Sequence, residues 1–192
     1  MRILGIDPGL NTTGFGVIDI PDEHYFAQNE GTLVEAGCFR LGDASRSIAH
    51  RLTELESDVS VLIQRTTPQW MCIESLFSHS RFPRTSITMA HARGVILLVA
   101  QRLGIDITEV SPAEAKKSLT GNGRATKAQV QNSVMRTLRL TAPPEPLDVS
   151  DALAIALSGA RRINSQALLN EDPITKKVIS PQRAKRTQRN QM

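Results

Sequence analysis

Short apolar runs in the first third of the chain predict a set of strands. Residues 2–6, 12–18 and 32–41 are apolar or partly alternating, and polar or turn-forming residues separate them. Consecutive strands with short connections form an antiparallel meander. Gly14 and Gly16 leave one face of the second strand bare, which we interpret as close packing within the sheet.

Helical spacing dominates the rest of the chain, with two further apolar runs between the helices. Helices are expected over residues 45–65, 87–103, 111–120, 126–138 and 148–162, and strands over residues 70–73 and 105–110. A meander followed by strand–helix–strand crossovers gives an α/β fold. Its five-stranded mixed sheet would combine the antiparallel meander with two parallel strands, and helices would flank both faces.

Length and composition favour a single domain. With 192 residues, of which 40% are hydrophobic, the chain can bury one substantial core, which we assign to residues 1–165. Residues 166–192 lack apolar periodicity and predict a basic, disordered tail. No apolar run of about 18 residues and no signal peptide is visible, so we expect a cytoplasmic protein without membrane contact. Cys38 and Cys72 lack ligand-like spacing and are expected to be free thiols.

Charge is distributed unevenly along the chain. Residues 1–169 contain 17 Lys and Arg against 17 Asp and Glu, so the net charge of +4 lies in the tail. Within the neutral part, residues 81–139 contain ten basic residues against three acidic ones. This asymmetry fits a polyanion bound beside an acidic, cation-binding cleft, although solvated helix faces and a solubilising tail explain the charges equally well. We expect the tail to strengthen salt-sensitive DNA binding.

Four carboxylates stand where an unpaired acid is costly. Asp7 and Glu74 end apolar strands, whereas Asp148 and Asp151 open an otherwise apolar helix and share one of its faces. Each has an ordinary structural explanation when taken alone, as a loop acid, an N-cap or a first-turn acid. If the first and fourth strands are neighbours, however, Asp7 and Glu74 lie side by side at the carboxyl edge of the sheet.

A cluster of like charges at that edge needs cations to neutralise it. Carboxylate oxygens without nitrogen or sulfur ligands favour Mg²⁺ or Mn²⁺ over zinc. Two such ions ~4 Å apart can activate water and stabilise the leaving oxygen of a phosphodiester displacement. The basic stretch at residues 81–139 would hold the phosphates, so the residues indicate a metal-dependent nuclease.

Four segments of the chain resemble the RuvC-type Holliday junction resolvases of bacteria, a branch of the ribonuclease H-like superfamily. They are GIDPGLNTTGFGVI, IESLF, EAKKSLTGNGRATKAQVQ and LDVSDALAIALSGA, in the family's order over roughly residues 1–162. The resemblance implies a ribonuclease H-like fold. It also implies that the four carboxylates are the catalytic and metal-binding residues.

Substrate contacts and partners follow from the same resemblance. Lys116 and Lys127 would lie at the DNA near the active site, and Phe77 would contact or stack on junction bases. Arg84 and Arg124, from the basic stretch, are further candidate DNA contacts. The enzyme would be a homodimer that nicks two opposing strands of a four-way junction and leaves 5′-phosphate and 3′-hydroxyl ends. A RuvA-type junction-binding protein and a RuvB-type branch-migration motor would be its partners.

Our mechanistic hypothesis is that Asp7 bridges two Mg²⁺ ions, with Glu74 and either Asp148 or Asp151 completing their coordination and Mn²⁺ able to substitute. Two other function classes share parts of the pattern. ATP-binding relatives of sugar kinases or chaperones begin with a similar strand, Asp and Gly-rich hairpin. They need a second domain and a second phosphate motif, for which 192 residues leave no room. A catalytically silent nucleic-acid-binding module would leave the four acids without a purpose.

Overall fold

The structure of the protein is a computed structural model that describes residues 1–21, 31–42, 45–75 and 83–171, with only the backbone described at 83–85 and 167–171. The elements in chain order are β1 (Arg2–Asp7), β2 (Thr12–Asp19), β3 (Thr32–Arg40), α1 (Ile48–Thr66), β4 (Trp70–Glu74), α2 (Pro83–Arg102), β5 (Asp106–Val110), α3 (Pro112–Thr120), α4 (Lys127–Leu138) and α5 (Leu147–Glu171). Within these described ranges, no helix is both long and apolar enough to span a membrane.

The five strands form one sheet in the order β3-β2-β1-β4-β5. β2 pairs antiparallel with both β1 and β3, while β4 runs parallel to both β1 and β5. The predicted mixed sheet is therefore confirmed. Because Ile6 lies opposite Ile73 in the parallel pair, β1 and β4 deliver Asp7 and Glu74 to the same edge of the sheet.

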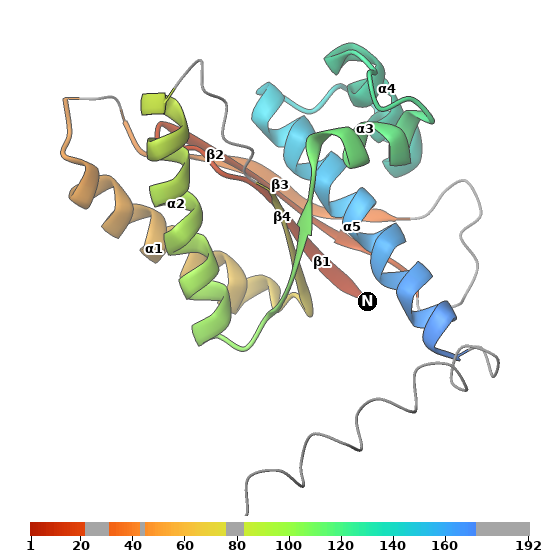
Figure 1. The fold of residues 1–192 in the computed structure, drawn as a ribbon, viewed down its shortest axis with the longest axis horizontal. Helices are drawn as coiled ribbons and strands as arrows, with labels where there is room; N and C mark the ends of the chain where they lie inside the picture. Colours follow the sequence, from red (N-terminus) through yellow and green to blue (C-terminus); the bar gives the residue numbers. More distant parts are fainter. Residues whose placement is uncertain (22–30, 43–44, 76–82, 172–192) are drawn as a thin grey trace, which may run out of the picture.

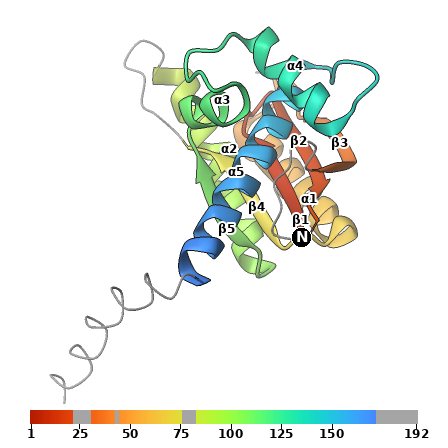
Figure 2. The same ribbon diagram turned by 90° about the vertical axis from the view of Figure 1, so that its right-hand side faces the viewer.

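Helices cover both faces of the sheet (Figure 1). Alternate residues of β1 point to opposite cores: Leu4 and Ile6 pack with α1 and α2, whereas Ile3 packs with α5 and the short helices α3 and α4. Figure 2 shows α5 running along the sheet, with α3 and α4 near its N-terminal half. The layer formed by α3, α4 and α5 lies next to the ends of β1 and β4, which carry Asp7 and Glu74.

Glycines let α5 rest directly on the backbone of β1 and β2. A Cβ atom at Gly5 would lie 2.2 Å from the carbonyl oxygen of Ala152, and one at Gly14 would lie 2.1 Å from that of Asp148. At Gly16 it would lie 2.4 Å from the side chain of Leu153. We expected the bare glycine face to pack within the sheet, and this expectation is wrong. The face packs against helix α5 instead.

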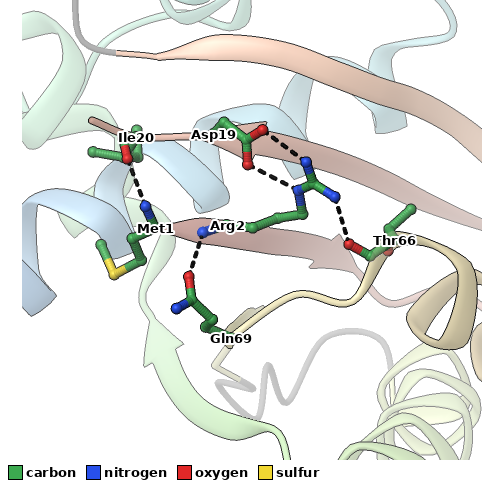
Figure 3. A network of polar contacts seen from close by, with 6 residues as sticks. All are labelled: Met1, Arg2, Asp19, Ile20, Thr66 and Gln69. Carbon is green, nitrogen blue, oxygen red and sulfur yellow. Dashed lines mark hydrogen bonds and ion pairs between the residues drawn. The ribbon is translucent and has the colours of Figure 1, made fainter. Parts of the chain in front are cut away.

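The opposite end of β1 is held by polar contacts (Figure 3). The Arg2 guanidinium donates to both carboxylate oxygens of Asp19 at 2.8 Å, and its Nη1 donates to the carbonyl oxygen of Thr66 at 2.8 Å. The N-terminal ammonium of Met1 donates to the carbonyl oxygen of Ile20 at 2.7 Å. These bonds join β1 to β2 and to the last turn of α1, away from Asp7.

Three helix boundaries differ from the prediction. α1 starts after Ser47, whose side chain accepts a hydrogen bond from His50 N, rather than at Ser45. α2 begins earlier, at Pro83, a residue suited to a first helical turn. α5 continues to Glu171, beyond the predicted end at 162 and into the predicted tail, which begins at residue 166. The sequence beyond residue 164 has no apolar periodicity from which the end of this helix could be predicted, and residues 172–192 lie outside the described residues.

Both cysteines are free, as predicted. Cys72 is buried beneath α5, where a Cβ atom at Gly159 would lie 2.1 Å from its Sγ atom. Burial raises the pKa of the Cys72 thiol to about 12. The thiol therefore remains neutral and contributes to packing.

Replacing Gly5 with Ala should separate α5 from the sheet. The added methyl group meets backbone oxygen, which cannot move aside alone, so we expect unfolding to become easier by about 3 kcal/mol or more. Gly123→Ala is the matched control, because its Cβ atom would approach nothing closer than 3.4 Å. Urea unfolding followed by circular dichroism would measure both variants. Equal midpoints would contradict the proposed role of the glycine contact.

Candidate active site

Asp7 and Glu74 lie side by side where β1 and β4 end, as the sequence predicts from their positions. Both are half-buried, and each carboxyl group affects the pKa of the other. Burial, followed by the charge of Glu74, raises the pKa of Asp7 to about 8. Burial is also the main cause of the raised pKa of Glu74. In the absence of a cation the pair therefore retains a proton near neutral pH.

Asp148 and Asp151 approach this pair from the first turns of α5. The backbone of Asp148 rests on Gly14, which is opposite Asp7 in the β1–β2 register. The charges of both aspartates contribute to the raised pKa of Asp7. The structure thus brings together all four predicted carboxylates, which come from two strands and one helix.

Asp7 stands between two hollows of the surface. A cleft of about 260 Å³ contains Glu74 and Asp151 together with Lys116 and Lys127. An open groove of about 450 Å³ on its other side is lined by Asp148, by residues 8–12 and by Thr88 and Met89. Asp7 borders both. An extended polyanion that enters either hollow would therefore pass the acids.

Both lysines that were predicted to contact DNA reach the cleft. Lys127 Nζ lies 2.9 Å from Asp151 Oδ2, and this hydrogen bond raises the pKa of Lys127. Lys116 also lines the cleft, and its charge lowers the pKa of Glu74 against the larger effect of burial. The lysines therefore supply positive charge at the mouth of an acidic site, where a phosphate would need it.

The other predicted DNA contacts are not brought to the acids in the described part of the chain. Arg124 is exposed in the α3–α4 connection and lines neither hollow; its backbone N donates to Asn122 Oδ1 at 2.9 Å. Phe77 and the side chain of Arg84 lie outside the described residues. Their roles stay predictions.

Sequence reasoning missed a contact that holds Glu74. Arg93 of α2 donates from Nε to the carbonyl oxygen of Glu74 at 3.2 Å, and its Nη2 lies 2.6 Å from Glu109 Oε1. Only 14% of the Arg93 side chain is exposed. Because the contact joins α2, β4 and β5, no local pattern could have identified it.

The donor chemistry of the site fits divalent cations. The four acids offer only carboxylate oxygens, as Mg²⁺ and Mn²⁺ prefer, and burial together with neighbouring carboxylates raises the pKa values of Asp7 and Glu74. Among the described residues, no three His, Cys, Asp or Glu side chains already converge as a metal-ligand set. The argument for a metal therefore rests on charge and ligand type.

Known proteins share both the sequence and the fold. The family model described as crossover junction endodeoxyribonuclease RuvC matches residues 3–159. A protein of that name from Rhodopirellula baltica is 44% identical over 160 residues, which cover 82% of this chain and 84% of the relative. The Thermus thermophilus RuvC structure has a TM-score of 0.78 at 26% identity, covering 86% of this chain and 97% of that one. A second Thermus thermophilus RuvC structure, titled as a complex with Holliday junction substrate, has a TM-score of 0.78 at 25% identity and covers 86% and 96%.

These similarities confirm the predicted ribonuclease H-like fold with its five-stranded mixed sheet. The matched residues run from β1 into the middle of α5, so they include every strand and every helix that packs on the sheet. The match in sequence and the match in structure therefore agree, and the chain belongs to the RuvC family of crossover junction endodeoxyribonucleases, which are hydrolases.

Proposed function

We propose that this protein is a structure-selective endodeoxyribonuclease that resolves four-way DNA junctions by paired nicks in homologous recombination and repair. The proposal rests on one observation: four carboxylates, Asp7 among them, and two lysines cluster at one site of a RuvC-family fold. A related RuvC from Thermus thermophilus has been solved with a Holliday junction substrate, which supports the same substrate class here.

Asp7, Glu74, Asp148 and Asp151 would hold the divalent cations, Mg²⁺ or Mn²⁺. When bound, two such ions activate the attacking water and stabilise the leaving oxygen of the phosphodiester. Asp7 borders both hollows, so it would be a ligand for an ion bound in either of them. Arg93 holds the strand end that carries Glu74.

Basic residues would position the DNA. Lys116 and Lys127 would bind phosphates flanking the scissile one, since both reach the cleft beside the acids. Phe77, Arg84 and Arg124 remain candidate contacts to the junction. Water attacks phosphorus and the bond to the 3′ oxygen breaks, so the products carry 5′-phosphate and 3′-hydroxyl ends that a ligase can seal.

A homodimer would place two such sites on opposing strands of one junction. Along one face of α2, Ile87 and Leu98 are exposed by 57% and 48%, and His91 and Gly94 between them are also exposed. Residues at this spacing share a helix face, and an apolar face open to water is typical of an interface. We infer that α2 faces the second subunit. A RuvA-type junction binder and a RuvB-type motor in the bacterial cytoplasm are the proposed partners.

The first test replaces Asp7 with Asn. Loss of the central carboxylate should reduce cleavage of a synthetic four-way junction in Mg²⁺ by at least about 10³-fold, since charge stabilisation of the transition state is lost. Junction binding should remain intact or become tighter, because one negative charge is removed next to the DNA. Asp106→Asn, at an exposed position on β5, is the control and should cleave normally. Nicking by the Asp7 variant at the wild-type rate would overturn the assignment.

Without divalent metal, stability should fall as the pH rises. The folded-state pKa of Asp7, about 8, lies above its ordinary value of 3.8. Its stabilising contribution is therefore complete below about pH 4 and is lost as the pH rises through 8. We expect a loss on the order of 4 kcal/mol between pH 5 and pH 9 in EDTA.

Urea unfolding at several pH values would measure this loss. Asp7→Asn should remove most of it, and Mg²⁺ should reverse it in the wild type only. A flat profile in EDTA would show that the pKa of Asp7 is not raised in the folded state.

The dimer proposal is tested by the double variant Ile87→Glu with Leu98→Glu. Two buried charges at the interface should convert the dimer to a monomer in analytical ultracentrifugation and abolish paired nicking. Val34→Glu is the control, since Val34 is 41% exposed on the edge strand β3 and lies away from α2. A double variant that remains dimeric would exclude this face of α2 as the interface.

A further inference from the structure

A buried arginine behind the active site has no role in the mechanism described so far. Arg51, in the first turns of α1, is only 4% exposed, and its Nε atom is buried without a hydrogen-bond partner. Among the described residues no carboxylate pairs with it. Its guanidinium donates instead from Nη1 to the side-chain oxygen Oδ1 of Asn11 at 2.8 Å.

This placement of a cation is costly. A guanidinium stays charged at all relevant pH values, and burial of a charge without an ionic partner opposes folding. The N-terminal end of α1 adds to the cost, because the helix dipole is positive there. An anion close to Asn11 would offset both effects.

The bond to Arg51 fixes the orientation of the Asn11 amide. Because a guanidinium has donors only, Asn11 must present Oδ1 to it, and its Nδ2 donor then points elsewhere. The backbone of Asn11 is also held, since its carbonyl oxygen accepts from Leu41 N at 3.0 Å. In the described part of the chain, no acceptor is bound to Nδ2.

Asn11 lines the open groove that also contains Asp7 and Asp148. It is exposed there, whereas Arg51 lies behind it in the core. Donation from the charged guanidinium polarises the amide and strengthens Nδ2 as a donor. The groove therefore combines the proposed metal-binding acids with a preoriented, positively polarised hydrogen-bond donor.

We propose that Asn11, held by Arg51, donates a hydrogen bond to a phosphodiester oxygen of the bound DNA strand, next to the scissile phosphate. This inference rests on the proposed function, because it names a further contact of the same site. Asn11 is then a substrate-binding residue. Arg51 is a positioning residue that acts through it.

Binding is measured separately from cleavage, by fluorescence anisotropy of a labelled four-way junction with Ca²⁺ in place of Mg²⁺. Asn11→Ala should weaken affinity about tenfold, since a hydrogen bond to a charged oxygen is lost. Asn11→Asp should weaken it further, because the new carboxylate repels the phosphate. Gln64→Glu, which makes the same kind of change at an exposed position near the far end of α1, should bind like the wild type.

Neutral methylphosphonates, placed one at a time at the phosphates flanking the cleavage point, identify the contact itself. At one position the substitution should weaken the wild type about tenfold but leave Asn11→Ala unaffected. A purely structural role of Asn11 would lower affinity at every position alike. That result would overturn the proposal.

Substitutions of Arg51 test its action through Asn11. Arg51→Met should reproduce the loss seen with Asn11→Ala and add nothing to it in the double variant, whereas Arg51→Lys, which keeps a charged donor, should bind within about threefold of the wild type. If Arg51→Met does not fold, the binding measurements on the Asn11 variants test the proposal by themselves. A wild type that binds junctions without cleaving them contradicts the proposed nuclease, whereas normal binding by both Asn11 variants contradicts only this contact.

Discussion

The direct packing of α5 on strand backbone is the constraint on which the active site depends. A helix on a sheet is normally held off by a layer of side chains, but Gly5, Gly14 and Gly16 remove that layer. The first turns of α5 therefore lie close to the end of β1. Asp148 and Asp151 interact with Asp7 only because of this approach.

The same approach creates an electrostatic conflict. Burial of Asp7 and Glu74 is the main cause of their raised pKa values, and repulsion among carboxylates from three elements adds to it. Two well-packed cores on either side of the sheet outweigh this repulsion and hold the acids in place. If the site binds cations as proposed, it would be preorganised for them, because the fold already holds the acids together against their repulsion.

Positive groups surround the acids in two different ways. Lys116 and Lys127 line the cleft, and Lys127 forms an ion pair with Asp151 there. Arg93 and Arg51 are largely buried and act on the site through a backbone carbonyl and an amide side chain. The charges in the cleft suit binding of a polyanion, whereas the buried ones hold the chain segments next to the acids.

The sequence by itself determined the strands, the helices and the four acids, because periodicity and turn residues are local signals. On the condition that β1 and β4 are neighbours, the sequence also predicted that Asp7 and Glu74 meet, and the strand order of the sheet fulfils this condition. Only the tertiary structure decided that the glycine face receives α5, that Lys127 binds Asp151, and that Arg93 and Arg51 lie behind the site. Lys127 and Asp151 are 24 positions apart in the sequence, and Arg51 and Asn11 are 40 positions apart. Such contacts depend on how closely the helices pack on the sheet. No local pattern of residue types predicts how closely a helix packs on the sheet.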